Sequence, residues 1–456
     1  MASIFRLSSR LSRQLFSWRP FFQRPASPVR QFSQSNFPLL DSTEKLEEET
    51  LSWYSPDDFY PVKIGETWDL FQQGHLFYAR DSDKKSSDGH HLAEMIAIMG
   101  PPPKEMMQGS VYATEYFDGE GIVGTSGLYV SKVILGTAGY GSSKWQDWVL
   151  EEDEALPLLE HAFRMGINTW DTADAYSNGL SEEIIGKALK KYDIPREQVV
   201  ILSKIYYAID PATQPPISES LDKTKQHLVN RVGLSRKHIL SAVAESVRRL
   251  GTYIDVLQIH RLDRDVCPVE IMRALNDVVE SGQARYLGAS SMAAWEFQKL
   301  QYIADRHGWH QFISMQNYYN LLYREEEREM IPLCRDLGVG VLPWSPLARG
   351  VLAHKWDDRG SKREQTDKLL KVLVRGQENN PTDEEIVNRV AEVAEKRDVP
   401  MATVALAWCL KKGVYPITGL GSKHRIDQTV EAVRFHLTDQ EMAYLEEPYQ
   451  PKGVSY

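Results

Sequence analysis

Eight short apolar runs alternate with longer amphipathic stretches between residues 130 and 435, and this alternation limits the folds open to the chain. The runs begin at Val130, Ile167, Val199, Asp255, Ala284, Phe312, Gly340 and Tyr415. A glycine, which can end a helix in the left-handed conformation, follows five of the stretches, at Gly166, Gly251, Gly282, Gly308 and Gly338. Such alternation predicts strand–helix units and a parallel sheet.

The number of these units favours one architecture. Eight strand–helix units over about 310 residues are what a (β/α)8 barrel requires. A doubly wound sheet is the alternative, but it would carry a glycine-rich dinucleotide fingerprint after an early strand, and this sequence has none. We therefore expect an α/β chain: a (β/α)8 TIM barrel at residues 123–447, a poorly structured N-terminal extension before it and a C-terminal tail at 448–456.

In a barrel of this kind the carboxyl ends of the strands carry the active site. The residues at those ends are mostly polar: Gly136, Thr137, Asp171, Tyr176, Lys204, His260, Ser290, Ser291, Gln316, Trp344, Ser345 and Gly419. The aspartate, tyrosine, lysine and histidine among them are what proton delivery to a carbonyl group requires. An ammonium lowers the pKa of a phenol, which is about 10 when free, and a neutral imidazole can bind the substrate oxygen.

The acid and the phenol come from one stretch, INTWDTADAYSNGLSEEIIG at 167–186. We expect Asp171 to end a strand and hold Lys204 from the next strand, while Tyr176 lies on the loop and feels the field of that lysine. Ser181 is expected to cap the following helix, with Glu182 and Glu183 near the positive end of its dipole.

Several segments are similar to the aldo-keto reductases: DTADAYSNGLSEEIIGKAL, SVRRLGTYIDVLQIHRLD, GQARYLGASS, MQNYYNLL and PWSPLARGVL. The similarity is to the fungal aryl-alcohol-dehydrogenase-like branch, with the potassium-channel β-subunits as more distant relatives, and it spans residues 123–447. The resemblance implies Tyr176 as general acid and Lys204 as the residue that lowers its pKa. It also implies Asp171 as the ion-pair partner of Lys204, and His260 as the group that orients the carbonyl.

The resemblance further implies NADP(H), bound extended across the barrel mouth. Ser290 and Gln316 would contact the carboxamide, Trp344 would stack on the nicotinamide ring, and the run 345–350 would wrap the pyrophosphate. In full, the implied cofactor contacts are Gly136, Thr137, Asp171, Ser290, Ser291, Gln316, Trp344, Ser345, Pro346, Leu347, Ala348, Gly350 and Gly419, with Lys355, Arg363, Arg425 and Gln428 at the adenosine end. Ser291 departs from the family pattern, which often has asparagine there, and the front hairpin that covers the barrel floor is reduced to GTSGLYVS.

Residues 1–122 differ from the barrel in composition. The first forty residues hold six arginines but no Asp, Glu or Lys. This is typical of a mitochondrial targeting segment, which we place at 1–36; a basic tail on a cytoplasmic protein is the alternative. Residues 37–122 resemble a remnant of a serine/arginine-rich-protein-specific kinase. They lack the glycine-rich loop, the strand lysine, the catalytic-loop aspartate and the D-F-G motif, so kinase activity is not expected.

Composition argues against several classes of function. A net charge of −10 argues against a nucleic-acid-binding surface, and no apolar run is long enough to insert into a membrane as a spanning helix. The three cysteines form no C-x-x-C pair. The spacing of His90, His91 and Glu94 is typical of a polar helix face more than of a metal site.

The expected function is NADPH-dependent reduction of aldehydes or ketones, aryl aldehydes included, with a small carbonyl or alcohol compound as the partner. An NADP(H)-binding redox-sensing or regulatory subunit with little turnover is the alternative. The physiological substrate, the direction of the reaction and the oligomeric state stay open.

Overall fold

The computed structural model describes residues 123–210, 228–376 and 380–455. Two predicted features lie outside these residues: the targeting segment and the kinase-like segment with His90, His91 and Glu94. The predicted barrel at 123–447 lies within them except for residues 211–227 and 377–379.

All eight predicted strands are present and pair in parallel. They are β1 Ile134–Gly136, β2 Thr169–Asp171, β3 Val200–Ile205, β4 Ile254–Ile259, β5 Ala284–Ser290, β6 Phe312–Gln316, β7 Gly340–Val341 and β8 Ile417–Thr418. They form one sheet in the order β7-β6-β5-β4-β3-β2-β1-β8. The two end strands are joined by backbone bonds from Tyr415 N to Val341 O (3.0 Å) and from Ile417 N to Pro343 O (2.9 Å). The sheet therefore closes, and the (β/α)8 barrel is confirmed.

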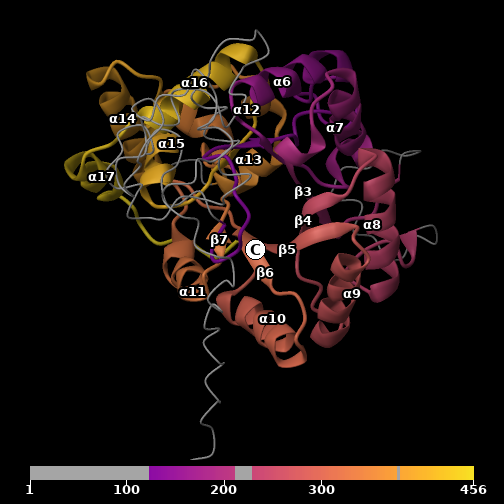
Figure 1. Ribbon diagram of the computed structural model, residues 1–456. Coiled ribbons are helices and arrows are strands. Elements are labelled where there is room, and N and C mark those ends of the chain that lie inside the picture. Colours follow the sequence, from indigo (N-terminus) through magenta and orange to yellow (C-terminus); the bar gives the residue numbers. More distant parts are fainter. Residues whose placement is uncertain (1–122, 211–227, 377–379, 456) are drawn as a thin grey trace, which may run out of the picture. The chain divides into compact units, whose positions relative to one another are not determined.

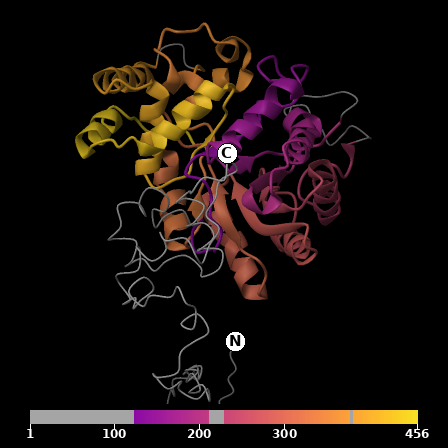
Figure 2. The ribbon, with the colours of Figure 1, turned by 45° about the horizontal axis from the view of Figure 1, so that its top comes forward.

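The predicted helical runs are helical and surround the strands (Figure 1; Figure 2 shows the same arrangement from another side). They are α6 Glu152–Arg164, α7 Leu180–Lys191, α8 Arg236–Leu250, α9 Pro268–Glu280, α10 Ala294–His307, α11 Met330–Asp336, α14 Pro381–Lys396, α15 Met401–Lys411 and α16 Lys423–Arg434. Three further helices were not predicted: α12 Lys362–Thr366, α13 Lys368–Leu373 and α17 Asp439–Glu446. In the part of the chain that the structure describes, no helix has the length and apolar character to cross a membrane.

The predictions about helix ends had different outcomes. The five glycines expected to end helices have φ between 64° and 84°, as predicted: Gly166, Gly251, Gly282, Gly308 and Gly338. The prediction that Ser181 caps α7 was wrong, because the N-cap residue is Gly179 and Ser181 lies in the first turn of the helix. The Ser181 hydroxyl instead donates to Thr137 O (3.0 Å) and accepts a hydrogen bond from the Thr172 hydroxyl (3.0 Å). It ties α7 to the ends of β1 and β2.

Apolar side chains fill the barrel and the layer between sheet and helices. Side chains from β1, β3, β4, β8 and the end of β7 can meet only inside the barrel, where they form one cluster: Ile134, Leu202, Val256, Leu342 and Ile417. Leu128 packs against this cluster. It belongs to the described remainder of the front hairpin, which is fixed by bonds from Val123 N to Leu128 O (2.9 Å) and from Thr125 N to Gly338 O (2.7 Å).

A buried glutamate lies in the 3-10 helix η5, Glu325–Glu327, which follows β6. The Glu326 carboxylate accepts one side-chain hydrogen bond, from Asn317 Nδ2 (2.7 Å), and no cation pairs with it among the described residues. Burial raises the pKa of Glu326 to about 7. Its neighbour Glu327 differs, since it is paired with Arg324 and Lys412. Burial opposes ionisation of Glu327 too, but the bonds from Arg324 and Tyr319 leave its pKa below the ordinary value.

These opposite shifts predict opposite effects of the same substitution. A group whose pKa is raised in the folded state contributes stability that is present at low pH and is lost as pH rises through about 7. Glu326→Gln should therefore raise the free energy of unfolding at pH 8, by on the order of 1–3 kcal/mol, and by less at pH 5. Glu327→Gln should lower it at pH 8. Urea unfolding of both variants at the two pH values measures this, and equal effects of the two substitutions would contradict it.

Candidate active site

The ends of β2 and β3 bring a buried ion pair together. Lys204 Nζ lies 2.6 Å from Asp171 Oδ1, and the two side chains are 0% and 3% exposed. The ammonium also donates to Thr172 O (2.8 Å) and to the Tyr176 hydroxyl (3.2 Å). All three hydrogens of the ammonium thus have acceptors, and one of these acceptors is the phenol.

A tight turn aims Tyr176 at the lysine. Tyr176 opens the 3-10 helix η2, Tyr176–Gly179, in which Ser177 and Asn178 adopt left-handed conformations with φ of 47° and 53°. The turn packs closely on the loop after β1, because a Cβ on Gly141 would lie 2.1 Å from Ser177 Oγ. Ser142 N donates to the same hydroxyl (3.2 Å). The close contact holds the tyrosine above Lys204, whose Nζ is 4.8 Å from the ring centroid.

The second oxygen of Asp171 anchors the pair to the other side of the barrel. Asp171 Oδ2 accepts hydrogen bonds from Gln258 Nε2 (3.1 Å) and Gln316 Nε2 (2.8 Å). Gln316 Nε2 also donates to Gln258 Oε1 (3.1 Å). The network joins β2, β3, β4 and β6. Gln258 was not predicted, although a glutamine two residues before His260 in a mostly apolar strand is a usable signal.

His260 follows β4 and lies edge-on to two tyrosine rings. Its ring centroid is 5.9 Å from that of Tyr176 and 4.9 Å from that of Tyr207, with interplanar angles of 85° and 82°. Nδ1 is buried and has no hydrogen-bond partner among the described residues. Burial, and then the charges of Lys204 and Arg261, lower the pKa of His260 well below its ordinary value. The imidazole is therefore neutral at pH 7.

The phenol and the ammonium respond to burial differently. Burial raises the pKa of Tyr176, and the nearby Lys204 ammonium lowers it by less, so that the net shift is upward. Lys204 does lower the pKa of Tyr176, as expected, but this effect is smaller than the effect of burial. Burial alone would lower the pKa of Lys204, but the Asp171 carboxylate and Tyr176 raise it above the ordinary value. At neutral pH the site holds a protonated phenol beside a charged ammonium.

Two aromatic residues near Tyr176 were not predicted. The Trp145 ring centroid lies 6.3 Å from that of Tyr176, and Tyr207 packs on His260. Both side chains are buried. The Trp145 Nε1 donor has no partner among the described residues. Trp145 follows β1 and Tyr207 follows β3, so both come from the carboxyl ends of strands.

The expected carboxamide residues lie at the ends of β5 and β6. The Ser290 hydroxyl donates to Gln316 O (2.9 Å), and Trp344 Nε1 donates to Ser291 Oγ (3.1 Å). Ser291 therefore keeps its own hydrogen for a further acceptor. Its φ of 43° is left-handed, which explains why asparagine suits this position. Trp344 stacks on Tyr318 with ring centroids 4.6 Å apart.

The run after β7 has an unusual backbone. Ser345, Ala348, Arg349 and Gly350 have φ of 53°, 47°, 60° and 105°. Pro346 and Leu347 lie between them, and the run leads into the 3-10 helix η6, Ala348–Ala353. Several left-handed residues in a short loop store strain, which is typical of ligand-binding loops.

Three arginines gather beyond this run. Arg349 and Arg363 both contact the Asp367 carboxylate, and the Arg363 guanidinium lies 3.9 Å from the Trp148 ring centroid. Burial, followed by the charge of Arg349 and the weaker influence of Arg425, lowers the pKa of Arg363 to about 10. Arg349 and Arg363 share one carboxylate, and Arg425 forms no ion pair among the described residues, so the cluster has excess positive charge that suits a phosphate. Arg349 lies in the run 345–350 that was expected to wrap the pyrophosphate, although it was not named among the contacts.

The other predicted cofactor residues are less closely gathered. Gly136 and Gly419 approach each other at the ends of β1 and β8, since a Cβ on Gly419 would lie 3.9 Å from Gly136 O. The buried Thr137 hydroxyl is used within the fold, on Asp171 O (3.0 Å) and on Ser181 Oγ (2.8 Å). Lys355 is exposed, and Gln428 is half-buried in α16.

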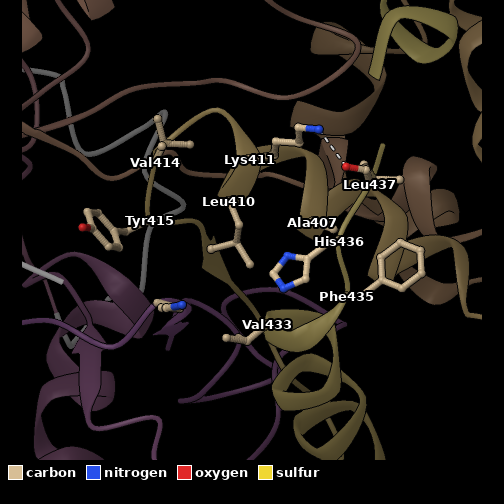
Figure 3. Close-up of a pocket in the computed structure, with 11 residues that line it drawn as sticks. Ala407, Leu410, Lys411, Val414, Tyr415, Val433, Phe435, His436 and Leu437 are labelled. Atoms are coloured by element: carbon tan, nitrogen blue, oxygen red, sulfur yellow. Dashed lines mark hydrogen bonds between the residues drawn. The ribbon is translucent and has the colours of Figure 1, made fainter. Parts of the chain in front are cut away.

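A separate hollow of about 340 Å³ lies at the opposite end of the barrel. Figure 3 shows its lining, with Leu410, Val433 and Phe435 around His436, and Lys411 Nζ bonded to Leu437 O. Lys132 and Tyr415 at its edge precede β1 and β8, so this hollow is on the amino-terminal side of the strands. It contains none of the predicted site residues.

Comparison with known proteins agrees with this geometry. The model of the Aldo/keto reductase family matches residues 132–450. The chain is 61% identical over 334 residues to the versiconal hemiacetal acetate reductase of Aspergillus parasiticus, which covers 73% of this chain and 97% of that protein. It is 51% identical over 345 residues to a Schizosaccharomyces pombe protein named "Putative aryl-alcohol dehydrogenase", covering 73% and 96%. It is 47% identical over 347 residues to the aldo-keto reductase AMT2 of Alternaria alternata, covering 73% and 93%.

The family match spans nearly the whole described barrel, from just before β1 to beyond α17. The relatives named as reductases and dehydrogenases match over the same large share of the chain. The chain therefore belongs to the aldo/keto reductase family and is an NADP(H)-dependent oxidoreductase that acts on carbonyl groups.

Proposed function

We propose that the chain reduces aldehydes or ketones, aryl aldehydes among them, to alcohols, with Tyr176 as the proton donor. The observation that carries the proposal is the contact between the Tyr176 hydroxyl and the buried Lys204 ammonium (3.2 Å), which is itself paired with Asp171. A protonated phenol with a charged ammonium behind it can give up its proton and leave a stabilised phenolate. The names of the relatives support a carbonyl or alcohol substrate.

The residues around the barrel mouth fit NADP(H). The Ser291 hydroxyl, Ser290 Oγ and Gln316 Oε1 offer a donor and acceptors to an amide, and the Trp344 ring offers an aromatic face. At the other end Arg349, Arg363 and Arg425 offer positive charge to a phosphate. When bound, NADPH supplies the hydride that the carbonyl carbon receives.

The chain's own residues supply the proton and the orientation. Tyr176 donates its hydroxyl proton to the carbonyl oxygen, and Lys204 stabilises the phenolate that remains. Asp171 keeps the ammonium charged and fixed, with Gln258 and Gln316 holding its second oxygen. The neutral His260 imidazole can donate one hydrogen bond to the same carbonyl oxygen, and this directs the substrate toward Tyr176.

Removal of the phenol oxygen tests the proton donor. Tyr176→Phe in the full chain should lower kcat for benzaldehyde reduction by about 10² to 10⁴ fold, because the proton must then come from water. Cofactor binding, followed by quenching of tryptophan fluorescence with NADPH, should persist. Reduction at the wild-type rate would refute the role of Tyr176. NADPH binding without turnover on a broad set of carbonyl compounds by the wild type would instead favour a redox-sensing subunit.

The pH dependence of the reaction follows from the two shifted groups. The His260 pKa lies well below 6.5, so the imidazole stays neutral at pH 6, and the Tyr176 pKa lies above 10, so the phenol keeps its proton at pH 9. We expect kcat/KM for reduction to be flat between about pH 6 and pH 9 and to fall only at higher pH. An inflection near pH 6.5 that His260→Gln removes would contradict a neutral imidazole.

The arginine cluster predicts the choice between cofactors. Arg425→Gln removes one of three cations and should raise KM for NADPH about tenfold or more, with a much smaller effect on KM for NADH. Arg397→Gln is the matched control, since Arg397 is paired with Glu441 on α17. The ratio of the two KM values, measured with one aldehyde, decides the outcome. A ratio that Arg425→Gln leaves unchanged would exclude Arg425 from phosphate binding.

A further inference from the structure

Arg261 lies directly after the proposed catalytic histidine and has no role in the reaction described so far. Its Nη1 donates to His260 O (2.6 Å), so the side chain folds back along the end of β4 instead of extending into solvent. The residue is half-buried. Its positive charge acts on both Tyr176 and His260, which places the guanidinium on the side of the barrel where the carbonyl must bind.

The charge of Arg261 is not matched within the described part of the chain. A guanidinium offers five N–H donors, and the one hydrogen bond described uses Nη1 alone. None of the carboxylates in the described ranges forms an ion pair with it. The next arginine on the same loop is different. Arg264 forms a bidentate ion pair with Glu296, from Nε to Oε1 (2.6 Å) and from Nη2 to Oε2 (2.9 Å). Of these two arginines on the loop after β4, only the one beside His260 is left without a carboxylate among the described residues.

Flat aromatic surfaces lie next to the two groups on which the charge of Arg261 acts, Tyr176 and His260. Trp145 packs beside Tyr176, and Tyr207 packs on His260, so the proton donor and the imidazole both have aromatic neighbours. Trp145 Nε1 is a buried donor without an acceptor among the described residues. Aromatic side chains favour a flat ring by stacking, and a fixed guanidinium favours an anionic oxygen.

We propose that Arg261 is a specificity residue, an inference that rests on the proposed reduction. It selects aryl aldehydes or ketones whose ring carries an anionic oxygen group, either a carboxylate or an ionised phenol. The ring lies against Trp145 and Tyr207, and the anionic oxygen accepts hydrogen bonds from the free N–H groups of Arg261. Binding of that group orients the carbonyl toward Tyr176 and His260.

Two other roles for Arg261 make different predictions. An arginine that only fixed the backbone of His260 would affect all substrates equally. If Arg261 stabilised charge on the reacting oxygen, its replacement would lower kcat for charged and neutral substrates alike. Only recognition of a substrate anion changes the ratio between a charged substrate and its neutral analogue.

The test compares meta- and para-carboxybenzaldehyde with their methyl esters in the full chain, as ratios of kcat/KM with saturating NADPH. The wild type should prefer at least one acid over its ester. Arg261→Met should reduce that preference on the order of ten- to a hundredfold, and Arg261→Lys should retain part of it. Arg264→Met is the matched control and should leave the preference unchanged. Thermal unfolding of each variant shows that it is folded.

The outcomes separate this inference from the proposed function. Turnover of none of the four aldehydes by the wild type would refute the reductase proposal and the inference with it. Turnover of the acids and the esters without a preference for either acid, or a preference that survives in Arg261→Met, would refute the inference alone. Loss of the preference in Arg264→Met as well would also refute it, because the effect would then be general positive charge on the loop.

Discussion

The barrel mouth is organised around a charge that the fold buries completely, the ammonium of Lys204. Removing a charge from water costs several kcal/mol, so it is tolerated only with full compensation. Asp171 supplies the opposite charge, and Thr172 O and the Tyr176 hydroxyl take the remaining hydrogens. The carboxylate is satisfied in turn by two glutamine amides from β4 and β6. Loss of any side chain of this network leaves a buried polar group without a partner. The position of Tyr176 therefore depends on the packing of β2, β3, β4 and β6.

The fold could be predicted from the sequence because its signals are local and repeated. Alternating strands and helices, with glycines after the helices, are visible in short windows, and all eight strands appeared where they were expected. The helices α12 and α13 were missed because they have only five and six residues, too few to show a period, and α17 was missed because it follows the last predicted strand–helix unit. Ser181 was misjudged because its hydroxyl bonds to Thr137 and Thr172, and no local pattern reveals a partner 44 residues away.

The candidate site was predictable to a different degree. Strand ends of a barrel converge, so a list of polar residues at those ends placed Asp171, Tyr176, Lys204 and His260 in one region before any distances were known. Residues that act by filling or charging that region were missed. Trp145, Tyr207 and Arg261 were not singled out, and Arg349 was covered only as part of the run 345–350. Their significance lies in what surrounds them: Arg349 shares one carboxylate with Arg363, whereas Arg261 has none in the described chain.

The barrel is closed by its two shortest strands. β7 and β8 have two residues each, and they meet through a few backbone hydrogen bonds, whereas β3 to β5 pair over longer stretches. Short pairings open locally more often than long ones. Groups proposed to bind the nucleotide lie on both sides of the β7–β8 junction, in the loop after β7 and at the start of α16 after β8. A ligand that contacts both sides binds only when this junction is closed. Occupancy of the cofactor site would therefore set how often the junction opens, and with it the rates of protease cleavage and of backbone amide hydrogen exchange.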